Sequence, residues 1–210
     1  MNTAETNRFN ELAKDWDTKP DRVERARKFG DGLLQLIRKH QLKTALDYGA
    51  GTGLVSFYLL DHLEHICLLD MSEGMLEVMQ RKIDQYGVKN ASLVQADLIH
   101  EELTDKYDLI YILMTLHHIL DTQKILKAFY QHLNPGGWLC IGDLTAEDGS
   151  FHYKYPEFDG HNGFDESLLT QQLKSTGFEA VESNIFYQIE KDINGKIKNF
   201  PLFFMSARKK

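Results

Sequence analysis

A glycine-rich segment, Asp47-Tyr48-Gly49-Ala50-Gly51-Thr52-Gly53-Leu54, links a short apolar run to a stretch with helical periodicity. Glycines let a backbone turn tightly and approach a ligand closely, and the first N–H groups of a helix can bind polar ligand atoms. The dinucleotide-binding pattern G-x-G-x-x-G needs a third glycine at the position of Leu54. The carboxylate of Asp47 would repel a pyrophosphate in a poorly hydrated site. The segment therefore indicates a ligand that presents a cation or hydrogen-bond donors rather than a phosphate.

Two further aspartates follow the next two apolar runs, Asp70 in Leu-Leu-Asp-Met-Ser and Asp97 in Gln-Ala-Asp-Leu. The carboxyl ends of parallel strands meet at one edge of a sheet, where ligands bind. A carboxylate can accept hydrogen bonds from two neighbouring hydroxyls. A single aspartate at such a position is usually a strand-end cap or a solvated turn residue, but three at consecutive strand ends indicate one ligand site. S-adenosylmethionine fits the requirement set by the glycine-rich segment and Asp47, because it carries an ammonium group and a sulfonium but no phosphate.

Histidine is the side chain best suited to accept a proton near neutral pH, so the candidate catalytic residues are histidines. They are His117, His118, His152 and His161. The first two follow an apolar run, where a ring can also serve only in packing or hydrogen bonding. The other two lie in the aromatic-rich segment 144–164, together with Glu147 and Asp148. These side chains could hold a base, a substrate amine or a metal ion, or could simply tie the segment down. Because no regular ligand spacing is present, we predict no metal site.

The pattern of apolar runs beyond residue 40 predicts the elements that would position these residues. Short apolar runs alternate with amphipathic helical windows, which is typical of βαβ units in a parallel sheet. We expect strands at 44–48, 65–70, 91–96, 107–113 and 137–143. Asn194-Gly195 then predicts a hairpin between two long strands, about 179–192 and 196–208. Asp108 begins its strand at the edge away from the ligand, so we interpret it as structural.

Helices are expected at 1–17, 20–40 and 165–174, the last with Asp165 as its N-cap. We therefore predict an α/β, Rossmann-like fold: a seven-stranded, mostly parallel sheet with helices on both faces and an antiparallel last strand. Residues 1–40 would form an N-terminal helical cap and residues 41–210 the ligand-binding domain, together one structural domain. Segment 144–164 follows the fifth strand and is long for a loop, so we expect it to cover the site as a lid.

The composition restricts the class of protein. A chain of 210 residues suits one domain, and 42% hydrophobic with 26% charged residues is ordinary for a globular protein. The formal net charge of −7 argues against a nucleic-acid partner, which needs a basic face. Cys67 and Cys140 lie inside apolar runs, so we expect buried free thiols. No segment resembles a signal peptide or is apolar enough to span a membrane, so we expect a cytoplasmic protein, either a monomer or a homodimer.

Segment 47–53 resembles motif I of the class I S-adenosylmethionine-dependent methyltransferases, D/E-x-G-x-G-x-G, and the chain is similar to the small bacterial members of that family. The match extends over about residues 40–145. The resemblance implies that Asp70 binds both ribose hydroxyls of the cofactor. It also implies that Asp97 meets the adenine amino group and that the backbone N–H of Leu98 meets the adenine ring. The cofactor would be S-adenosyl-L-methionine, which becomes S-adenosyl-L-homocysteine.

The expected cofactor site draws on several parts of the chain. Trp16, on the N-terminal helix, would close the pocket, and Met114, at the end of strand 107–113, would lie near the transferred methyl group. The full set is Trp16, Asp47, Gly49, Ala50, Gly51, Thr52, Gly53, Asp70, Met71, Asp97, Leu98 and Met114.

The expected activity is methyl transfer to an unidentified small-molecule acceptor. Transfer from a sulfonium mainly requires an acceptor held in line and the exclusion of water, so a base is needed only when the acceptor must lose a proton. One alternative is a non-catalytic regulatory protein that binds S-adenosylmethionine. Another is a nicotinamide-dependent oxidoreductase, against which Leu54 and Asp47 count. The acidic balance disfavours an RNA substrate, and a protein substrate stays open.

Overall fold

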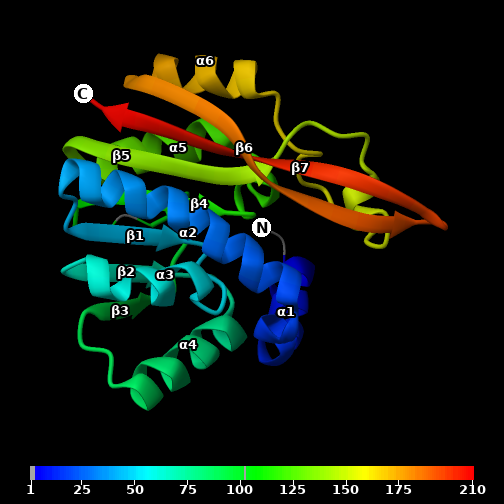
Figure 1. The fold of residues 1–210 in the computed structure, drawn as a ribbon, viewed down its shortest axis with the longest axis horizontal. Coiled ribbons are helices and arrows are strands. Elements are labelled where there is room, and N and C mark those ends of the chain that lie inside the picture. Colours follow the sequence, from blue (N-terminus) through cyan, green and yellow to red (C-terminus); the bar gives the residue numbers. More distant parts are fainter. Residues whose placement is uncertain (1–2, 102) are drawn as a thin grey trace.

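The computed structural model describes residues 3–101 and 103–210, in which strands and helices alternate along most of the chain (Figure 1). The α-helices are α1 (Thr3–Leu12), α2 (Pro20–His40), α3 (Leu54–Leu59), α4 (Glu73–Tyr86), α5 (Thr122–His132) and α6 (Glu166–Thr176). The 3-10 helices are η1 (Ala13–Thr18), η2 (Leu60–His62), η3 (Leu116–His118) and η4 (Ser150–His152). The strands are β1 (Thr44–Tyr48), β2 (His65–Leu69), β3 (Ala91–Val94), β4 (Tyr107–Leu113), β5 (Leu133–Leu144), β6 (Phe178–Ile193) and β7 (Lys196–Lys209). The first two residues of the helix expected at 1–17 lie outside the described residues.

The strands form one seven-stranded sheet in the order β3-β2-β1-β4-β5-β7-β6. Strands β1 to β5 pair in parallel, and β7 runs antiparallel between β5 and β6. This topology confirms the predicted α/β fold with its antiparallel last strand. The strand order reverses between β1 and β4, and a parallel sheet opens a ligand-binding crevice at the carboxyl ends of the strands that flank such a switch point.

Each strand sends alternate side chains to opposite faces of the sheet, and helices cover both faces. On one face Ala45 of β1 belongs to a core that includes Phe29 of α2 and residues of α3 and α4. On the other face the next residue, Leu46, belongs to a core that includes Phe129 of α5 and Leu173 of α6. None of these side chains is exposed to solvent. Burial of a large apolar side chain stabilises a fold by about 1.5–3 kcal/mol, so the two cores hold the strands that carry the site.

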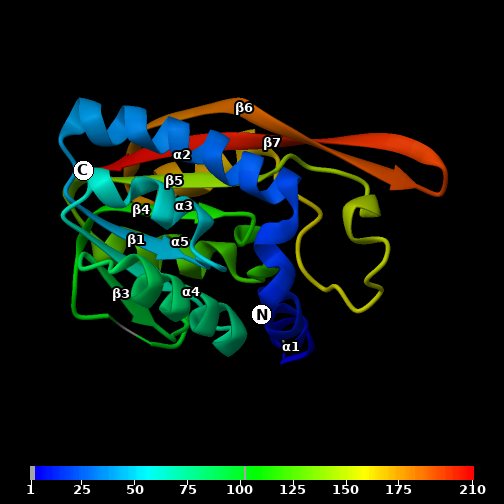
Figure 2. The ribbon, with the colours of Figure 1, turned by 60° about the horizontal axis from the view of Figure 1, so that its bottom comes forward.

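The residues predicted as an N-terminal cap, 1–40, occupy two different positions. Helix α2 is part of the layer over the sheet, where Leu33 and Ile37 are buried. Helices α1 and η1 lie beyond the carboxyl ends of the strands (Figures 1 and 2). The side-chain oxygen of Asn10 accepts a hydrogen bond from the backbone N–H of Gly74 at 3.0 Å, which ties α1 to the start of α4. The part of the cap that covers the ligand edge is therefore α1 with η1.

Two strand boundaries differ from the prediction by more than one residue, for local reasons. Strand β3 ends at Val94 rather than at 96, because its last partner on β2 is Leu69, where β2 also ends. Strand β5 begins at Leu133 rather than at 137, because Asn134-Pro135-Gly136-Gly137, a sequence typical of a type II turn, lies inside the strand at an irregularity in the pairing with β4. Gly136 has the positive φ, +79°, that this turn requires.

The C-terminal hairpin is confirmed and supports the segment predicted as a lid. Asn194 and Gly195 have φ of +55° and +82°, the pair of positive values typical of a type I′ turn. The hairpin projects past the rest of the sheet toward residues 145–164 (Figure 1). There Phe151 of the lid packs against Phe200 of β7, with ring centroids 5.1 Å apart. The lid therefore rests on the hairpin, and the only helix inside it among the described residues is η4.

Other predictions concern positions away from the ligand edge. Asp108 Oδ2 accepts the backbone N–H groups of Lys43 and Thr44 at 3.0 and 3.1 Å, which confirms its structural role. Cys67 and Cys140 are buried and free, as expected. Among the described residues, no helix has the length and apolar character needed to cross a membrane.

Candidate active site

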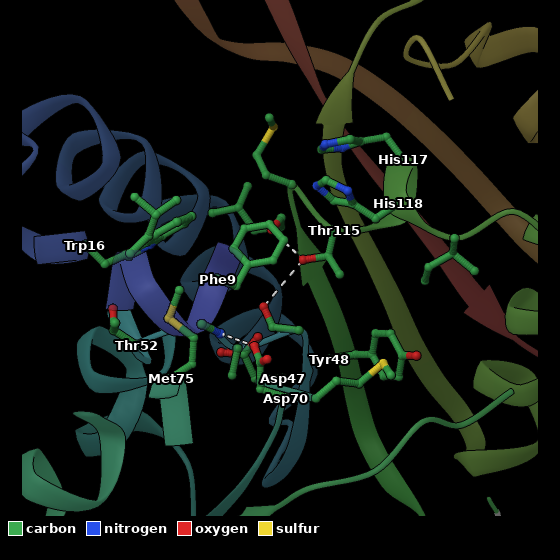
Figure 3. Close-up of a pocket in the computed structure, with 18 of the residues that line it drawn as sticks. Phe9, Trp16, Asp47, Tyr48, Thr52, Asp70, Met75, Thr115, His117 and His118 are labelled. Carbon is green, nitrogen blue, oxygen red and sulfur yellow. Dashed lines mark hydrogen bonds between the residues drawn. The ribbon is translucent and has the colours of Figure 1, made fainter. Parts of the chain in front are cut away.

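A cavity of about 510 Å³ lies at the carboxyl edge of the sheet, within the size range of small-molecule sites. Its lining includes residues 49–52 of the glycine segment, the ends of β1, β2 and β4, and parts of α1, η1 and the lid. Figure 3 shows His117 and His118 at one end and Asp47 and Asp70 at the other. Of the positions predicted to bind the cofactor, all line this cavity except Gly53 and Leu98.

The glycine loop has the backbone conformation that its sequence indicates. Gly49, Gly51 and Gly53 have φ of +71°, +58° and +79°, a region that side chains disfavour. A Cβ on Gly49 would lie 2.4 Å from Cγ2 of Thr115, so no larger residue fits between β1 and the end of β4. The Gly49 N–H donates to the carbonyl of Leu69 at 2.8 Å, which joins the loop to the end of β2.

Asp70 follows the last residue of β2 and binds two backbone N–H groups of its surroundings. Its Oδ2 accepts from Gly51 at 2.7 Å, and its Oδ1 accepts from Ser72 at 2.8 Å. Each carboxylate oxygen therefore keeps a lone pair for another donor. Burial raises the pKa of Asp70 to about 6, although backbone hydrogen bonds from Ser72, Gly51 and Met71 lower it. Further hydrogen-bond donors would therefore lower the pKa of Asp70 toward its usual value.

Asp47, at the end of β1, is 3% exposed and is held by α3. Its Oδ2 accepts from the hydroxyl of Ser56 at 2.7 Å, and that hydroxyl lies 2.7 Å from the hydroxyl of Tyr111. Burial raises the pKa of Asp47 to about 7. The predicted preference for a cationic ligand near Asp47 is compatible with this position, and the structure adds a role in fastening α3 to the glycine loop.

Asp97 lies in the loop after β3 and has three partners within the protein. Its Oδ1 accepts from the N–H of Ile99 at 2.9 Å and from the hydroxyl of Tyr48 at 3.3 Å, and its Oδ2 lies 2.9 Å from Nδ1 of His100. Burial alone would raise the pKa of Asp97, but these hydrogen bonds outweigh it and lower the pKa. The side chain of Leu98 is buried in the core, so the adenine contact expected of that residue involves only its backbone.

A polar network joins the N-terminal cover to the glycine loop. Thr52 is 1% exposed and donates from Oγ1 to Asp17 of η1 at 2.5 Å. Lys82 of α4 pairs with Asp17 at 2.5 Å and donates to the Thr52 carbonyl at 2.8 Å. Trp16 lines the cavity with the guanidinium of Arg22 stacked 3.7 Å from the centre of its ring. The Thr52 side chain therefore positions η1, which carries Trp16.

Met114, the residue after β4, has a left-handed backbone with φ of +53°. This conformation is uncommon for a residue other than glycine. It is strained and persists only where the surrounding structure holds it. The Met114 N–H donates to the carbonyl of Gly142 at 2.7 Å, so pairing with β5 maintains the strain. Met114 lines the cavity, as do Met71 and Ala50, so these predicted cofactor residues all reach one site.

His117 is 1% exposed and is oriented by a carboxylate of β5. Its Nδ1 lies 2.6 Å from Oδ1 of Asp143, and its backbone N–H donates to Oδ2 of the same residue at 3.1 Å. Asp143 is fully buried and also accepts the N–H of Leu144 at 2.8 Å. Because Nδ1 of His117 is directed at the Asp143 carboxyl group, Nε2 is the nitrogen left to accept a proton or to bind a metal ion.

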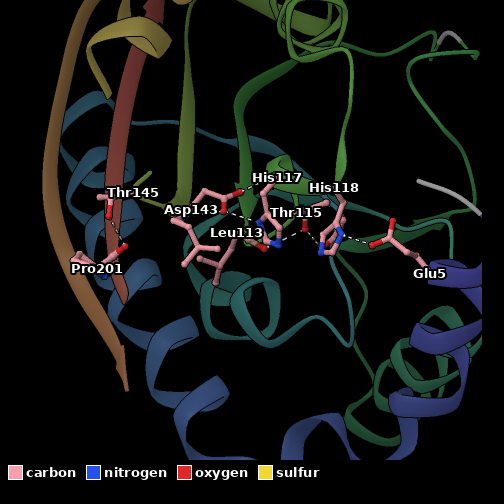
Figure 4. A network of polar contacts seen from close by, with 10 residues as sticks. Glu5, Leu113, Thr115, His117, His118, Asp143, Thr145 and Pro201 are labelled. Atoms are coloured by element: carbon pink, nitrogen blue, oxygen red, sulfur yellow. Dashed lines mark hydrogen bonds and ion pairs between the residues drawn. The ribbon is translucent and has the colours of Figure 1, made fainter. Parts of the chain in front are cut away.

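His118 is oriented in the same way from the other side (Figure 4). Its Nδ1 lies 2.9 Å from Oε1 of Glu5, a residue of α1 that is 2% exposed. Burial and the neighbouring His117 lower the pKa of His118 to about 4, despite the hydrogen bond to Glu5. His118 is therefore neutral near pH 7, with Nε2 as its available atom.

His152, in the lid, completes a cluster with these two rings. It stacks on Phe158, with ring centroids 3.7 Å apart, and its Nδ1 has no hydrogen-bond partner among the described residues. Burial, together with His117 and His118, lowers the pKa of His152 well below its ordinary value. One potential ligand atom from each of the three histidines lies within 4.8 Å of the others. The sequence analysis found no ligand spacing, yet the fold groups three rings that can bind a metal ion.

His161 does not join this cluster and does not line the cavity. Its Nε2 lies 3.0 Å from the carbonyl of Ile119 and 3.2 Å from the hydroxyl of Thr122, and its backbone N–H donates to the His117 carbonyl at 2.7 Å. These bonds tie the lid to the segment after β4. This position, outside the cavity lining, suits a structural role for His161 in fastening the lid.

Sequence reasoning missed the cationic side chains of the cavity. Arg8, Arg25 and Lys191 all line it. They come from α1, α2 and β6, and no motif in the sequence connects them. Burial lowers the pKa of Lys191 to about 8, and Arg8 Nη1 is buried without a hydrogen-bond partner among the described residues. Asp143 was also missed, although a signal existed, because it ends a predicted strand at the same edge as Asp70.

Comparisons with known proteins agree on one family. A methyltransferase-domain family matches residues 46–139. The chain is 26% identical over 152 residues to a ubiquinone biosynthesis O-methyltransferase from Hydrogenovibrio crunogenus, a match that covers 70% of this chain and 63% of the relative. It is 29% identical over 174 residues to phosphoethanolamine N-methyltransferase 1 from Zea mays, a match that covers 73% of this chain and 34% of the relative. The chain thus spans less than two thirds of the length of either relative.

The fold has close counterparts among solved structures. The N-methyltransferase NodS from Bradyrhizobium japonicum, solved in complex with S-adenosylhomocysteine, superimposes with a TM-score of 0.71. The match covers 98% of this chain and 97% of that one, at 16% sequence identity. At this identity the similarity shows a shared fold.

Proposed function

Because the chain belongs to the class I S-adenosylmethionine-dependent methyltransferases, we propose that it transfers a methyl group from S-adenosylmethionine to a small-molecule acceptor. The observation that carries this proposal is the single cavity that joins the strand-end aspartates to the histidine cluster. One end has the acceptors that a nucleoside requires, and the other end has polar groups for a second molecule. When bound, S-adenosylmethionine supplies a methyl group that is already activated by the positively charged sulfur.

The residues at the aspartate end fit this cofactor. Each oxygen of Asp70 has one backbone hydrogen bond and can accept another, which suits two neighbouring ribose hydroxyls. Asp47 is buried and accepts a hydrogen bond from the Ser56 hydroxyl, and its raised pKa would fall beside a positively charged ligand. Asp97 is ionised at neutral pH and lies at the cavity wall, where it can accept from an amino group such as that of adenine. We assign these three carboxylates to cofactor binding.

The cations near the histidines indicate that the acceptor carries an anionic group. Lys191 lies 3.2 Å from the ring centre of Phe151, which in turn packs beside His152. Arg25 is 11% exposed, and its ion pair with Asp21 is long, 3.9 Å. A carboxylate or phosphate on the acceptor would form charge-assisted hydrogen bonds with such groups. One relative is named for phosphoethanolamine, which carries a group of this kind.

Calorimetric titration of ligand-stripped protein with S-adenosylmethionine, S-adenosylhomocysteine and NADH tests the cofactor assignment. We expect micromolar binding of the first two and no heat with NADH. Binding of NADH alone would support the oxidoreductase alternative and overturn the proposal. Cofactor binding without turnover of any acceptor would favour the regulatory alternative.

An acceptor screen with methyl-labelled S-adenosylmethionine tests the acceptor class. Pools of amines, phenols and thiols would each be assayed in an acidic and a neutral version. We expect product from an acidic pool, and we expect Lys191→Met to raise KM for that acceptor with a smaller change in kcat. Turnover of neutral compounds only, with no effect of Lys191→Met, would contradict the anionic acceptor.

A further inference from the structure

Three buried histidines converge at the end of the cavity opposite Asp70. His117 and His118 follow β4, and His152 comes from the lid, far away in the sequence. The ring centroid of His117 lies 4.2 Å from that of His118 and 5.1 Å from that of His152. All three residues are less than a tenth exposed and line the cavity. One potential ligand atom of each ring lies within 4.8 Å of the other two, so three nitrogens are gathered in a site shielded from water.

Two of the rings are held as metal-binding histidines usually are. Metal-ligating histidines donate their other ring N–H to a carboxylate, which orients the ring and makes the ligand nitrogen more basic. His117 has this contact with Asp143 at 2.6 Å, and His118 has it with Glu5 at 2.9 Å. Figure 4 shows the two rings side by side between these carboxylates. In both rings the nitrogen left for a ligand is Nε2.

The third ring lacks any such bond within the described part of the chain. Nδ1 of His152 is buried and has no hydrogen-bond partner there, which is costly for a polar atom. Stacking on Phe158 positions the ring without satisfying its nitrogens. A ligand shared with His117 and His118 would supply a partner for this ring.

We propose that His117, His118 and His152 bind one divalent transition-metal ion at the acceptor end of the cavity. Imidazole nitrogen suits Zn²⁺, Fe²⁺, Co²⁺ and Ni²⁺, and three histidines with an open fourth position are a known arrangement for catalytic zinc. The carboxyl groups of Asp143 and Glu5 are both buried beside the cluster, where two carboxylates would compensate the charge of the ion.

The distances require a modest adjustment. Tetrahedral bonds of about 2.0–2.1 Å place ligand nitrogens roughly 3.4 Å apart. The three candidate atoms lie within 4.8 Å of one another, so the rings must approach by at most about 1.4 Å. His152 can make this movement because it belongs to the lid, which contains a single 3-10 turn among its described residues.

The open position of the ion would face the acceptor. This part of the inference rests on the proposed function, whereas metal binding by the histidines does not. An oxygen or sulfur atom of the acceptor would occupy the fourth position, and its anionic group would pair with Arg8 and Lys191 on the same wall. A single histidine acting as a base would need one oriented ring, and it would leave the convergence of the other two unexplained.

Metal titration of the full chain tests the site without the methyl acceptor. The protein is stripped with chelator, and Zn²⁺ binding is followed by competition with a chromophoric chelator, while Co²⁺ loading is followed by its visible spectrum. We expect one tight equivalent of metal and the intense bands of four-coordinate Co²⁺. His152→Ala should weaken that equivalent at least 100-fold, and Asp143→Asn should weaken it about 10- to 100-fold. Addition of thiocyanate should shift the Co²⁺ bands if the fourth position is open.

His161→Ala is the matched control, because it removes a lid histidine that lies outside the cluster and should leave metal binding unchanged. Circular dichroism and a cooperative thermal transition report that each variant is folded. Equal Zn²⁺ binding by the wild-type chain and by folded His152→Ala would overturn the metal site. Co²⁺ bands that do not respond to thiocyanate would overturn the open position. Failure of the cofactor titration with intact metal binding would instead count against the proposed function.

Discussion

The two ends of the cavity are built in different ways. At the aspartate end, the glycine loop and Asp70 belong to the first two strand ends, and the Gly51 N–H donates to the Asp70 carboxylate at 2.7 Å. At the histidine end, Glu5, Asp143 and His152 come from α1, β5 and the lid, and they meet at His117 and His118. The first end depends on backbone conformation within short segments. The second depends on the docking of segments that are distant in the sequence.

This difference suggests that the two ends can be disrupted separately. A change at Asp70 alters a local hydrogen-bond set and should not reach the histidines. A change at the lid should not reach the glycine loop, because the lid is attached to the hairpin and to the segment after β4. Thr115 is the point where the two ends meet, since its side chain contacts Gly49 and its carbonyl accepts the His118 N–H at 3.0 Å.

The largest expected effect is that of Asp70→Ala on the cofactor. Loss of charge-assisted hydrogen bonds to the ribose should weaken S-adenosylmethionine binding by about 2–3 kcal/mol, roughly 30- to 150-fold, as measured by calorimetry. Asp70→Asn keeps one acceptor oxygen, so its affinity for S-adenosylmethionine should lie between those of the wild-type chain and Asp70→Ala. His152→Ala, at the other end, should keep cofactor affinity within about twofold. Unchanged affinity in Asp70→Ala would contradict the assignment of Asp70 to the ribose hydroxyls.

Gly49→Ala should disturb the junction between the two ends. The new Cβ would require a left-handed alanine and would clash with Thr115 at 2.4 Å, so we expect a loss of about 2 kcal/mol in the free energy of unfolding. Gly87→Ala is the matched control, because Gly87 has φ of +62° with no atom within 4 Å of a Cβ and should lose about 1 kcal/mol. Urea denaturation of both variants gives the difference, and equal losses would mean that Thr115 moves aside freely.

Cofactor affinity should also depend on pH through the aspartate end. Ribose hydroxyls donate to the ionised form of Asp70, whose pKa burial raises to about 6. Below that pH the carboxyl must lose a proton before it binds, so the contribution of Asp70 to affinity should be constant above about pH 7 and about tenfold weaker at pH 5. Asp47, whose pKa burial raises to about 7, would add a separate decline that begins about one pH unit higher. Titrations from pH 5 to 8 measure the dependence, which should be reduced in Asp70→Asn; a flat profile in the wild-type chain would contradict it.

Much of the fold was predictable because it follows from local patterns. Alternating apolar runs indicated the strands, Asn194-Gly195 indicated the hairpin, and Asp165 indicated the start of α6, where it accepts the N–H groups of Ser167 and Leu168. Boundaries differed where pairing with a neighbouring strand decided them, as at Val94 and Leu133. The roles of individual site residues stay predictions, although the structure places most of them around one cavity.

The sequence by itself determined the aspartate end of this protein. Positive φ at Gly49, Gly51 and Gly53 and an acid at the end of β2 are properties of short segments, because backbone sterics and strand ends act over a few residues. Only the tertiary structure decided the histidine end. Whether a histidine faces a cavity, a carbonyl or a carboxylate depends on which distant segment docks against it. His152 and His161 therefore look alike in the sequence, yet one joins the cluster and the other fastens the lid.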